Sequence, residues 1–176
     1  MRGGRRTAAA GCTLRALRRL TGADAEQYRA VRLDALRDHP ESFGSSHEDE
    51  ADKPLAWFAD RLESGFVLGG FGPDGSLLGT AGLVIPAGSK LRHKGLLIGM
   101  FVRPASRGTG LAQALLDGVL VFARPLVEEV NLGVTGTNTA AIRLYARSGF
   151  VEYAREARVL KVGDRYYDEV FMARRP

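Results

Sequence analysis

A glycine turn between an apolar segment and a helix-forming segment is the feature of this sequence best suited to bind an anion. Residues 95–102 read GLLIGMFV, and glycines follow at positions 108 and 110, immediately before a run with helical periodicity. The N–H groups of a first helical turn lack intrahelical acceptors and lie at the positive end of the helix dipole. Gly108, Gly110 and the small Ala112 would let this backbone approach a phosphate closely. The segment therefore predicts a phosphate or pyrophosphate site.

Two other phosphate-binding motifs do not fit these residues. A P-loop needs Gly-Lys followed by Ser or Thr, whereas Leu111 and Ala112 follow Gly110. A dinucleotide fingerprint needs a third glycine where Gln113 stands, and the later pair at 128–129, two glutamates, gives only weak support for a ribose contact. Taken alone, the glycines fit a tight turn as well as a phosphate site, so the decision rests on the rest of the chain.

A second segment, NLGVTGTNTAAIRLYARSGF at 131–150, adds an amide and a phenol. Asn138 is placed to cap a helix that begins at Thr139. Tyr145 follows Asn138 by two helical turns, so both side chains are expected on nearly the same helix face. Alone, Asn138 is most simply a cap and Tyr145 a half-buried aromatic residue.

Together the two segments resemble the two signature motifs of the GNAT superfamily of acetyl-CoA-dependent N-acetyltransferases. The motifs are R-x-x-G-x-A at 107–112, which follows a strand, and N-x-x-A-x-x-L-Y at 138–145, which precedes Gly149-Phe150. The recognisable motifs cover about residues 95–153, and the order of elements from Leu14 to Ala173 is similar to the superfamily fold.

The resemblance implies a role for each motif residue. The strand backbone at 100–102 would bind the pantetheine arm and the thioester carbonyl, the glycine turn would hold the pyrophosphate, and Asn138 would hydrogen-bond the pantetheine region. Tyr145 would be catalytic, giving a proton to the departing CoA thiolate. The cofactor-binding residues implied are Met100, Phe101, Val102, Arg107, Gly108, Thr109, Gly110, Leu111, Ala112, Gln113 and Asn138.

The sequence departs from the superfamily at the general base. In several members a carboxylate five residues ahead of the motif asparagine has this role, and here that residue is Gly133. The remaining candidates are acidic residues of a polar connection and a histidine before the central strand, namely Glu48, Asp49, Glu50 and His93. The unperturbed pKa of a histidine, about 6.5, suits a general base at neutral pH. A solvated loop and a polar strand end are the commoner reasons for such residues, and Glu48 is the one we would test first.

The pattern of elements predicts a single mixed α/β (α+β) fold. The resemblance implies a central, mostly antiparallel mixed sheet of six or seven strands flanked by about four helices, splayed between the strands at 95–102 and 130–134. Amphipathic periodicity predicts helices over 23–37, 54–62 and 111–122. Turn signals at 72–75 and 163–164 predict two hairpins. The polar stretch between the first two helices is expected to be a mobile connection.

Charge and composition limit the classes of partner. The net charge of the 176 residues is +5, but residues 1–20 carry six arginines and no acid, which leaves the rest of the chain at −1. We therefore expect residues 1–12 to be a flexible arm, 13–176 to be a single domain, and no specific nucleic acid to bind. A positive cluster at 90–94 fits CoA phosphates, an acidic acceptor or a protective strand edge equally well. Without a membrane-spanning run, and with Cys12 as the single cysteine, a cytoplasmic location and no membrane partner are expected.

The resemblance thus implies an enzyme that uses acetyl-CoA and no metal to acetylate a primary amine. Because Cys12 lacks a nearby histidine and acid, direct transfer in a ternary complex is expected instead of an acyl-enzyme. A small-molecule amine is slightly favoured over a protein N-terminus or lysine, since no loop forms an obvious peptide-recognition insertion. A non-catalytic acyl-CoA sensor stays open as an alternative. In that fold the closing hairpin sometimes forms a dimer contact, so a homodimer is a further hypothesis.

Overall fold

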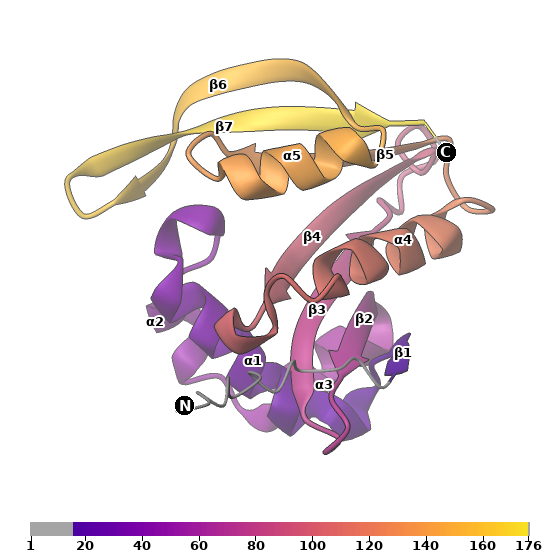
Figure 1. Cartoon of the computed structure of the whole chain (residues 1–176), viewed down its shortest axis with the longest axis vertical. Coiled ribbons are helices and arrows are strands. Elements are labelled where there is room, and N and C mark those ends of the chain that lie inside the picture. Colours follow the sequence, from indigo (N-terminus) through magenta and orange to yellow (C-terminus); the bar gives the residue numbers. More distant parts are fainter. Residues whose placement is uncertain (1–15, 176) are drawn as a thin grey trace, which may run out of the picture.

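Residues 16–175 are described by the computed structural model, and they form seven strands and five α-helices (Figure 1). The strands are β1 (Ala16–Arg19), β2 (Phe66–Phe71), β3 (Leu77–Val84), β4 (Lys94–Val102), β5 (Glu129–Thr135), β6 (Val151–Val162) and β7 (Arg165–Arg174). The helices are α1 (Ala25–Asp38), α2 (His47–Ala51), α3 (Leu55–Ser64), α4 (Leu111–Ala123) and α5 (Thr139–Arg147), with short 3-10 helices η1 (Gly22–Asp24), η2 (Pro40–Ser42) and η3 (Pro104–Ser106). The arm expected at 1–12 lies outside the described residues.

All seven strands belong to one sheet, in the order β1-β2-β3-β4-β5-β7-β6. Every neighbouring pair is antiparallel except β4 and β5, which are parallel. Both expected hairpins are present, β2–β3 and β6–β7. The prediction of a mixed, mostly antiparallel sheet of six or seven strands is confirmed.

The pairing between β4 and β5 is short. It joins Lys94 to Glu129, Gly95 to Val130 and Leu96 to Asn131, and then it ends. Six more residues of β4 and four more of β5 continue without pairing to each other. The sheet is therefore parted between these strands, as the resemblance implies.

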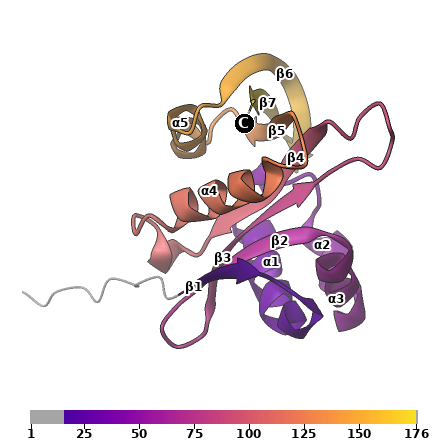
Figure 2. The same ribbon diagram turned by 90° about the vertical axis from the view of Figure 1, so that its right-hand side faces the viewer.

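Helices cover both faces of the sheet (Figure 2). One core lies under α4 and α5 and includes the fully buried Leu115 and Val119, which belong to the apolar stripe predicted for α4. The other core lies under α1 and α3 and includes Val31, Phe58 and Leu62. Each helix buries one apolar stripe against the sheet, so the two cores hold the parted strands between two helical layers.

The connection expected to be mobile contains a short helix, α2, that the sequence did not predict. Ser46 and Asp49 form a reciprocal capping box: the Asp49 N–H donates to Ser46 Oγ at 3.1 Å, and the Ser46 N–H donates to Asp49 Oδ2 at 3.1 Å. Glu50 then ties α2 to α1 through Arg32, at 2.7 Å. The helix depends on this distant partner, which is why local composition indicated a loop.

Candidate active site

The glycine turn leads from β4 through η3 into α4, and its backbone requires glycine. Gly108 has φ +77° and Gly110, the N-cap of α4, has φ +87°. Side chains with a Cβ are strained in this left-handed region. A Cβ at either position would meet nothing within 4 Å, so the turn faces open space. Among the described residues, the N–H groups of 108–113 have no hydrogen-bond acceptor. Unpaired donors at the positive end of a helix are suited to an anion.

Two side chains of this turn support the turn itself. Arg107 Nε donates to the Val102 carbonyl at 3.1 Å, and its guanidinium lies 2.8 Å from His39 Nε2. Thr109 Oγ1 donates to the Ser106 carbonyl at 2.7 Å. The structure thus uses the Arg107 and Thr109 side chains to hold the turn against the end of β4. The backbone N–H groups remain the donors available to a ligand.

The opening between β4 and β5 is bordered by an irregular stretch of β4. The β3–β4 register shifts between Thr80 and Gly82, and Thr80 Oγ1 donates to the Gly99 carbonyl at 3.1 Å. Past this bulge, Phe101 is buried in the core under α1, and Val102 is buried in the core under α4. Their side chains anchor the strand on both faces, so the edge that β4 presents to the opening is backbone.

The other side of the opening is continued by α5. Asn138 caps this helix as the sequence predicts, since its Oδ1 accepts the Ala141 N–H at 3.1 Å. The side-chain NH₂ of Asn138 is left as a donor. Tyr145 is buried against Phe150, with ring centroids 5.8 Å apart in an edge-to-face arrangement. Burial raises the pKa of Tyr145 to about 12, so its phenol stays protonated at neutral pH.

Gln113 connects the two helices that flank the opening. Its Nε2 donates to Ser148 Oγ at 3.0 Å, just beyond α5, and to Asp117 Oδ1 on α4 at 2.9 Å. The resemblance implied a place for Gln113 at the pyrophosphate. In the structure its side chain links the two helices, and its backbone N–H is among the donors at 108–113 without an acceptor in the described part of the chain.

Sequence reasoning did not single out Arg103, which fastens the turn to the opposite layer. Its Nη1 donates to Asp34 Oδ2 on α1 at 2.6 Å, and its Nε donates to the Leu77 carbonyl at 3.1 Å. The sequence indicated the role of Arg103 only by its place: it directly follows a buried strand and precedes the turn that positions the N-terminus of a helix. The partner Asp34 is 69 residues away.

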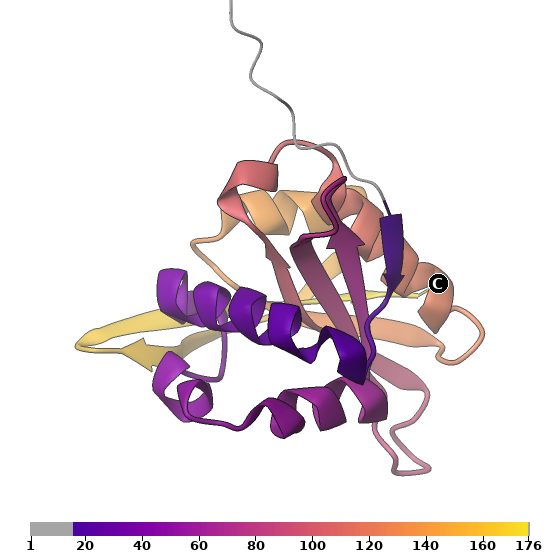
Figure 3. The ribbon, with the colours of Figure 1, turned by 90° about the horizontal axis from the view of Figure 1, so that it is seen from below.

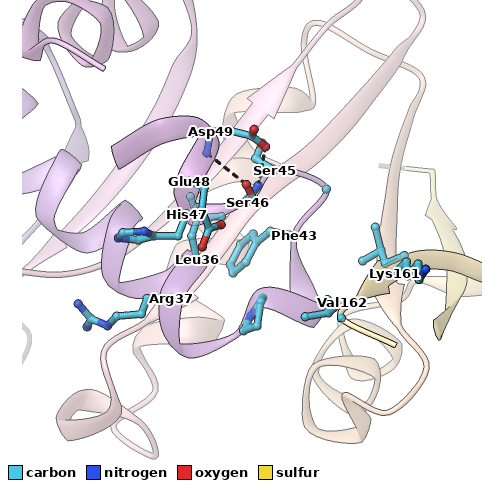
Figure 4. A pocket seen from close by; sticks show the side chains of 14 residues that line it. Leu36, Arg37, Phe43, Ser45, Ser46, His47, Glu48, Asp49, Lys161 and Val162 are labelled. Carbon is cyan, nitrogen blue, oxygen red and sulfur yellow. Dashed lines mark hydrogen bonds between the residues drawn. The ribbon is translucent and has the colours of Figure 1, made fainter. Parts of the chain in front are cut away.

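A cavity of about 540 Å³ lies on the face of the sheet that carries α1 and α2. It is lined by the segment from η2 to α2 on one side and by the tip of the β6–β7 hairpin, with Lys161 and Val162, on the other (Figure 4). Figure 3 shows this hairpin reaching out beside α1 and α2. Arg37, Glu48 and Asp49 also line the cavity. Its lining carries both signs of charge, which suits a polar guest.

The candidates for general base have different positions. Glu48 is exposed at the cavity, and Asp49 is engaged in the cap of α2. Glu50 is buried between Arg32 and a more distant Arg61. Burial alone would raise the pKa of Glu50, but hydrogen bonding and charge from Arg32, with the charge of Arg61, lower it. A carboxylate held in this way is a poor base. Asp49 is exposed but is engaged in the cap, so Glu48 is the one of the three that is exposed and outside both the cap and the ion pair.

His93 and the positive cluster at 90–94 lie away from the glycine turn. They precede or begin β4, whereas the turn follows its last residue, Val102. A nine-residue strand is about 30 Å long at about 3.3 Å per residue. Lys94 is paired with Glu129 at 3.1 Å. The structure therefore does not bring these residues to the site.

The parted sheet, with a glycine turn entering a helix beside the opening, defines a GNAT-type acetyltransferase fold. Residues 29–150 match the Acetyltransferase (GNAT) family, and the chain belongs to this family. Within residues 16–175 there is no group of three or more metal-ligating side chains, and no helix is long and apolar enough to cross a membrane.

Individual proteins are similar to the chain in sequence or in fold. Mycothiol acetyltransferase of Salinispora tropica is 34% identical over 147 residues, which cover 82% of this chain and 46% of the relative. The chain spans about half the length of the curated relatives it matches. An acetyltransferase of the GNAT family from Streptococcus pneumoniae superposes with a TM-score of 0.82 at 19% identity, covering 92% of this chain and 99% of that one. A phosphinothricin acetyltransferase from Sinorhizobium meliloti, in complex with acetyl-CoA, gives 0.80 at 18% identity, covering 93% and 88%.

Proposed function

We propose that this chain is an acetyl-CoA-dependent N-acetyltransferase, with residues 13–176 as its single domain, that acetylates a primary amine by direct transfer in a ternary complex. The observation that carries the proposal is the set of unpaired N–H groups at 108–113 beside the β4–β5 opening. These groups suit a pyrophosphate, and the opening beside them suits an extended thioester arm. Family membership supports the same reaction.

In this proposal the chain supplies three kinds of group. The backbone at 100–102 holds the thioester, and N–H groups freed where β4 leaves β5 stabilise the oxyanion of the tetrahedral intermediate. Asn138 contacts the pantetheine arm through its free NH₂. Tyr145, kept protonated by burial, gives its proton to the departing thiolate.

The acceptor proposed is a small-molecule amine that enters from the face with α1 and α2. The cavity of about 540 Å³ has a size suited to a small guest and a lining with charges of both signs. The similarity to mycothiol acetyltransferases also supports a small-molecule acceptor. The acceptor and the cofactor would then reach the thioester from different sides, as direct transfer requires.

Calorimetric titration with acetyl-CoA tests the cofactor site. Gly110→Glu should abolish binding, because the added carboxylate would project from the anion-binding turn. Gly75→Glu is the matched control: Gly75 has a φ of +79°, also faces open space, and lies in the β2–β3 turn. It adds the same charge under similar backbone strain and should leave the affinity unchanged. Absence of acetyl-CoA binding to folded wild-type protein would refute the proposal.

A second assay tests transfer. Release of free thiol from acetyl-CoA is followed with L-methionine, glucosamine, spermidine and an alanine-initiated peptide as acceptors. Turnover with one of the three small amines supports the acceptor class proposed. Turnover with the peptide alone would favour a protein N-terminus, and binding of acetyl-CoA without any turnover would favour an acyl-CoA sensor.

A further inference from the structure

A transferase of the proposed kind needs a base, because an alkylamine is protonated at neutral pH and cannot attack a carbonyl carbon in that form. The base must face the β4–β5 opening from the acceptor side. Glu169 on β7, which no sequence motif singled out, meets this requirement, and its assignment rests on the proposed function.

Strand register places Glu169 on the acceptor side of the sheet. In the β5–β7 pair, Thr135 lies opposite Glu169, and Gly133 lies opposite Phe171. Val170, between the two β7 residues, is buried in the core under α4 and α5, and Figure 1 shows α5 lying over these strands. Because successive side chains of a strand point to opposite faces, Glu169 faces away from α5.

The same face carries the acceptor cavity. Thr135 Oγ1 donates to the carbonyl of Glu41 in η2, so η2 covers this end of β5. Pro40 and Phe43, on either side of Glu41, line the cavity of about 540 Å³. Glu169 is therefore on the face from which an acceptor would enter.

Gly133 gives the Glu169 side chain its path toward the opening. Glu169 Oε2 lies 3.0 Å from the position that a Cβ on residue 133 would occupy, so the carboxylate lies across the β5 backbone. Gly133 is on the strand that borders the opening, two residues past the last β4–β5 pair. The missing side chain at 133 thus leaves room for a carboxylate that comes from the next strand.

The Glu169 carboxylate is available to accept a proton. Within residues 16–175 it has no hydrogen bond or ion pair. Arg155 on β6 is opposite Val170, not Glu169, and is paired with Glu152 at 3.3 Å. The titratable groups on this face are Glu156, the partner of Glu169 on β6, and Tyr167, two residues before Glu169 on β7. From the layer packed against this face come Glu41, whose carbonyl accepts from Thr135 opposite Glu169, and His39, which precedes η2. Burial, and then the charge of Glu156, raise the pKa of Glu169, which makes it a stronger base than an ordinary carboxylate.

We propose that Glu169 is the general base of the transfer reaction. Its carboxylate takes one proton from the acceptor ammonium and later releases it to water. The amine nitrogen bonds to the thioester carbon, and the C–S bond then breaks with its electron pair going to sulfur. The sulfur takes a proton from Tyr145, and the second proton lost by the nitrogen restores the phenol. The products are the N-acetyl amine, CoA thiol and one proton.

The test compares two acceptors in wild-type protein and in Glu169→Gln. One is the panel amine that gives the fastest thiol release, and the other is hydroxylamine, which is unprotonated at neutral pH and needs no base to become a nucleophile. Glu169→Gln should lower kcat/KM for the panel amine by about 100-fold, the low end of general-base effects. It should change hydroxylamine turnover little and leave acetyl-CoA affinity unchanged. A merely structural role would affect both acceptors.

Neighbouring variants sharpen the test. Burial and, after it, the charge of Glu156 raise the pKa of Glu169, and Glu156→Gln removes only the second cause. The acidic limb of the kcat/KM profile should therefore move to lower pH in Glu156→Gln and should vanish in Glu169→Gln. Gly133→Ala should reduce kcat with the panel amine, because its Cβ would displace the carboxylate. Glu152→Gln is the exposed control and should behave as wild type.

Three other outcomes would contradict the base, the transferase or the cofactor site. An unchanged pH profile and unchanged panel-amine turnover in Glu169→Gln would overturn the base while leaving the transferase intact. Wild-type protein that binds acetyl-CoA but transfers to neither acceptor would overturn the transferase, and the base with it. Absence of acetyl-CoA binding would refute the cofactor site itself.

Discussion

At the scale of single residues, burial suits Tyr145 and Glu169 to different roles in the proposed reaction. Tyr145 lies in an apolar core, and burial raises its pKa to about 12, so its phenol keeps a proton to give. Glu169 is half-buried beside another carboxylate, and its pKa is raised as well, so it takes a proton more readily than an exposed glutamate. Burial thus suits the phenol to give a proton and the carboxylate to take one.

Tyr145→Phe tests the proton donor. The ring and its contact with Phe150 remain, so the free energy of unfolding and acetyl-CoA affinity should change little. Loss of the hydroxyl should lower kcat by about 100-fold. Because a donor works below its pKa, and this pKa is about 12, the wild-type profile should show no basic limb from this phenol up to about pH 10. Thiol release, calorimetry and thermal melts are the measurements. Turnover that survives in the phenylalanine variant would remove Tyr145 from the mechanism.

At the scale of elements, the cavity proposed for the acceptor is shaped by an ion pair between α1 and α2. Arg32 and Glu50 meet at 2.7 Å with side-chain exposures of 9% and 4%. A second hydrogen bond, from Arg32 Nε to Glu50 Oε2 at 2.9 Å, makes the contact bidentate. α2 has only five residues, too few to be stable without such a partner. The lining of the cavity therefore depends on this pair.

Glu50→Gln should destabilise the fold by about 3 kcal/mol, because it leaves a buried guanidinium without its counter-charge. The matched control is Glu48→Gln on the same helix, where the side chain is exposed and the change should stay within about 0.5 kcal/mol. Denaturant titration measures both. Equal stability of the two variants would show that the pair contributes nothing to α2.

The pH dependence of this pair follows from the lowered pKa of Glu50 in the folded chain. A depressed pKa means that the folded state binds a proton less readily than the unfolded state. The stabilisation by the Arg32–Glu50 pair is therefore complete above the pKa of Glu50 in the unfolded chain, about 4.3. It is lost as the pH falls through the lower pKa of Glu50 in the folded chain. Wild-type protein should lose more stability than Glu50→Gln below about pH 4, which denaturant titrations at several pH values would show.

At the scale of the whole molecule, the parted strands are the feature on which the site depends. β4 and β5 pair over three residues and then separate, while the cores on the two faces keep each strand in place. The glycine turn lies at the end of β4, and α5 follows β5, so both signature motifs flank the same opening. A ligand in this opening would contact backbone from segments that do not pair with each other there.

Hydrogen exchange tests this arrangement. Acetyl-CoA should slow amide exchange at 99–102 and 108–113, where it would shield or accept these N–H groups. The β2–β3 hairpin should not change, because its amides are paired within the sheet. Protection confined to the β6–β7 hairpin would place the cofactor elsewhere and contradict the proposed site.

The sequence predicted the elements of the site better than their contacts. Asn138 was expected to cap α5, and it does. Local sequence patterns can predict a cap or a left-handed turn, because the residues involved are only a few positions apart. The resemblance implied a place for Gln113 near the pyrophosphate, and the structure adds a contact that the sequence did not predict: the Gln113 side chain bonds Ser148, which is 35 residues away. α2 was missed for a similar reason, since its ion-pair partner lies in another helix.

By itself the sequence determined the mixed α/β class, the glycine turn and the two motifs of the family, and the resemblance carried by those motifs implied the parted strands. Periodicity, turn chemistry and short motif spacing are local properties, so a single chain displays them directly. Only the tertiary structure showed which carboxylates are free and which are held. The charge of Glu50 is neutralised by Arg32 on the preceding helix α1. Glu169 belongs to β7, and its carboxylate lies over Gly133 on the neighbouring strand β5. Strand register and helix packing join residues that are distant in sequence, and the local pattern contains no signal for such contacts.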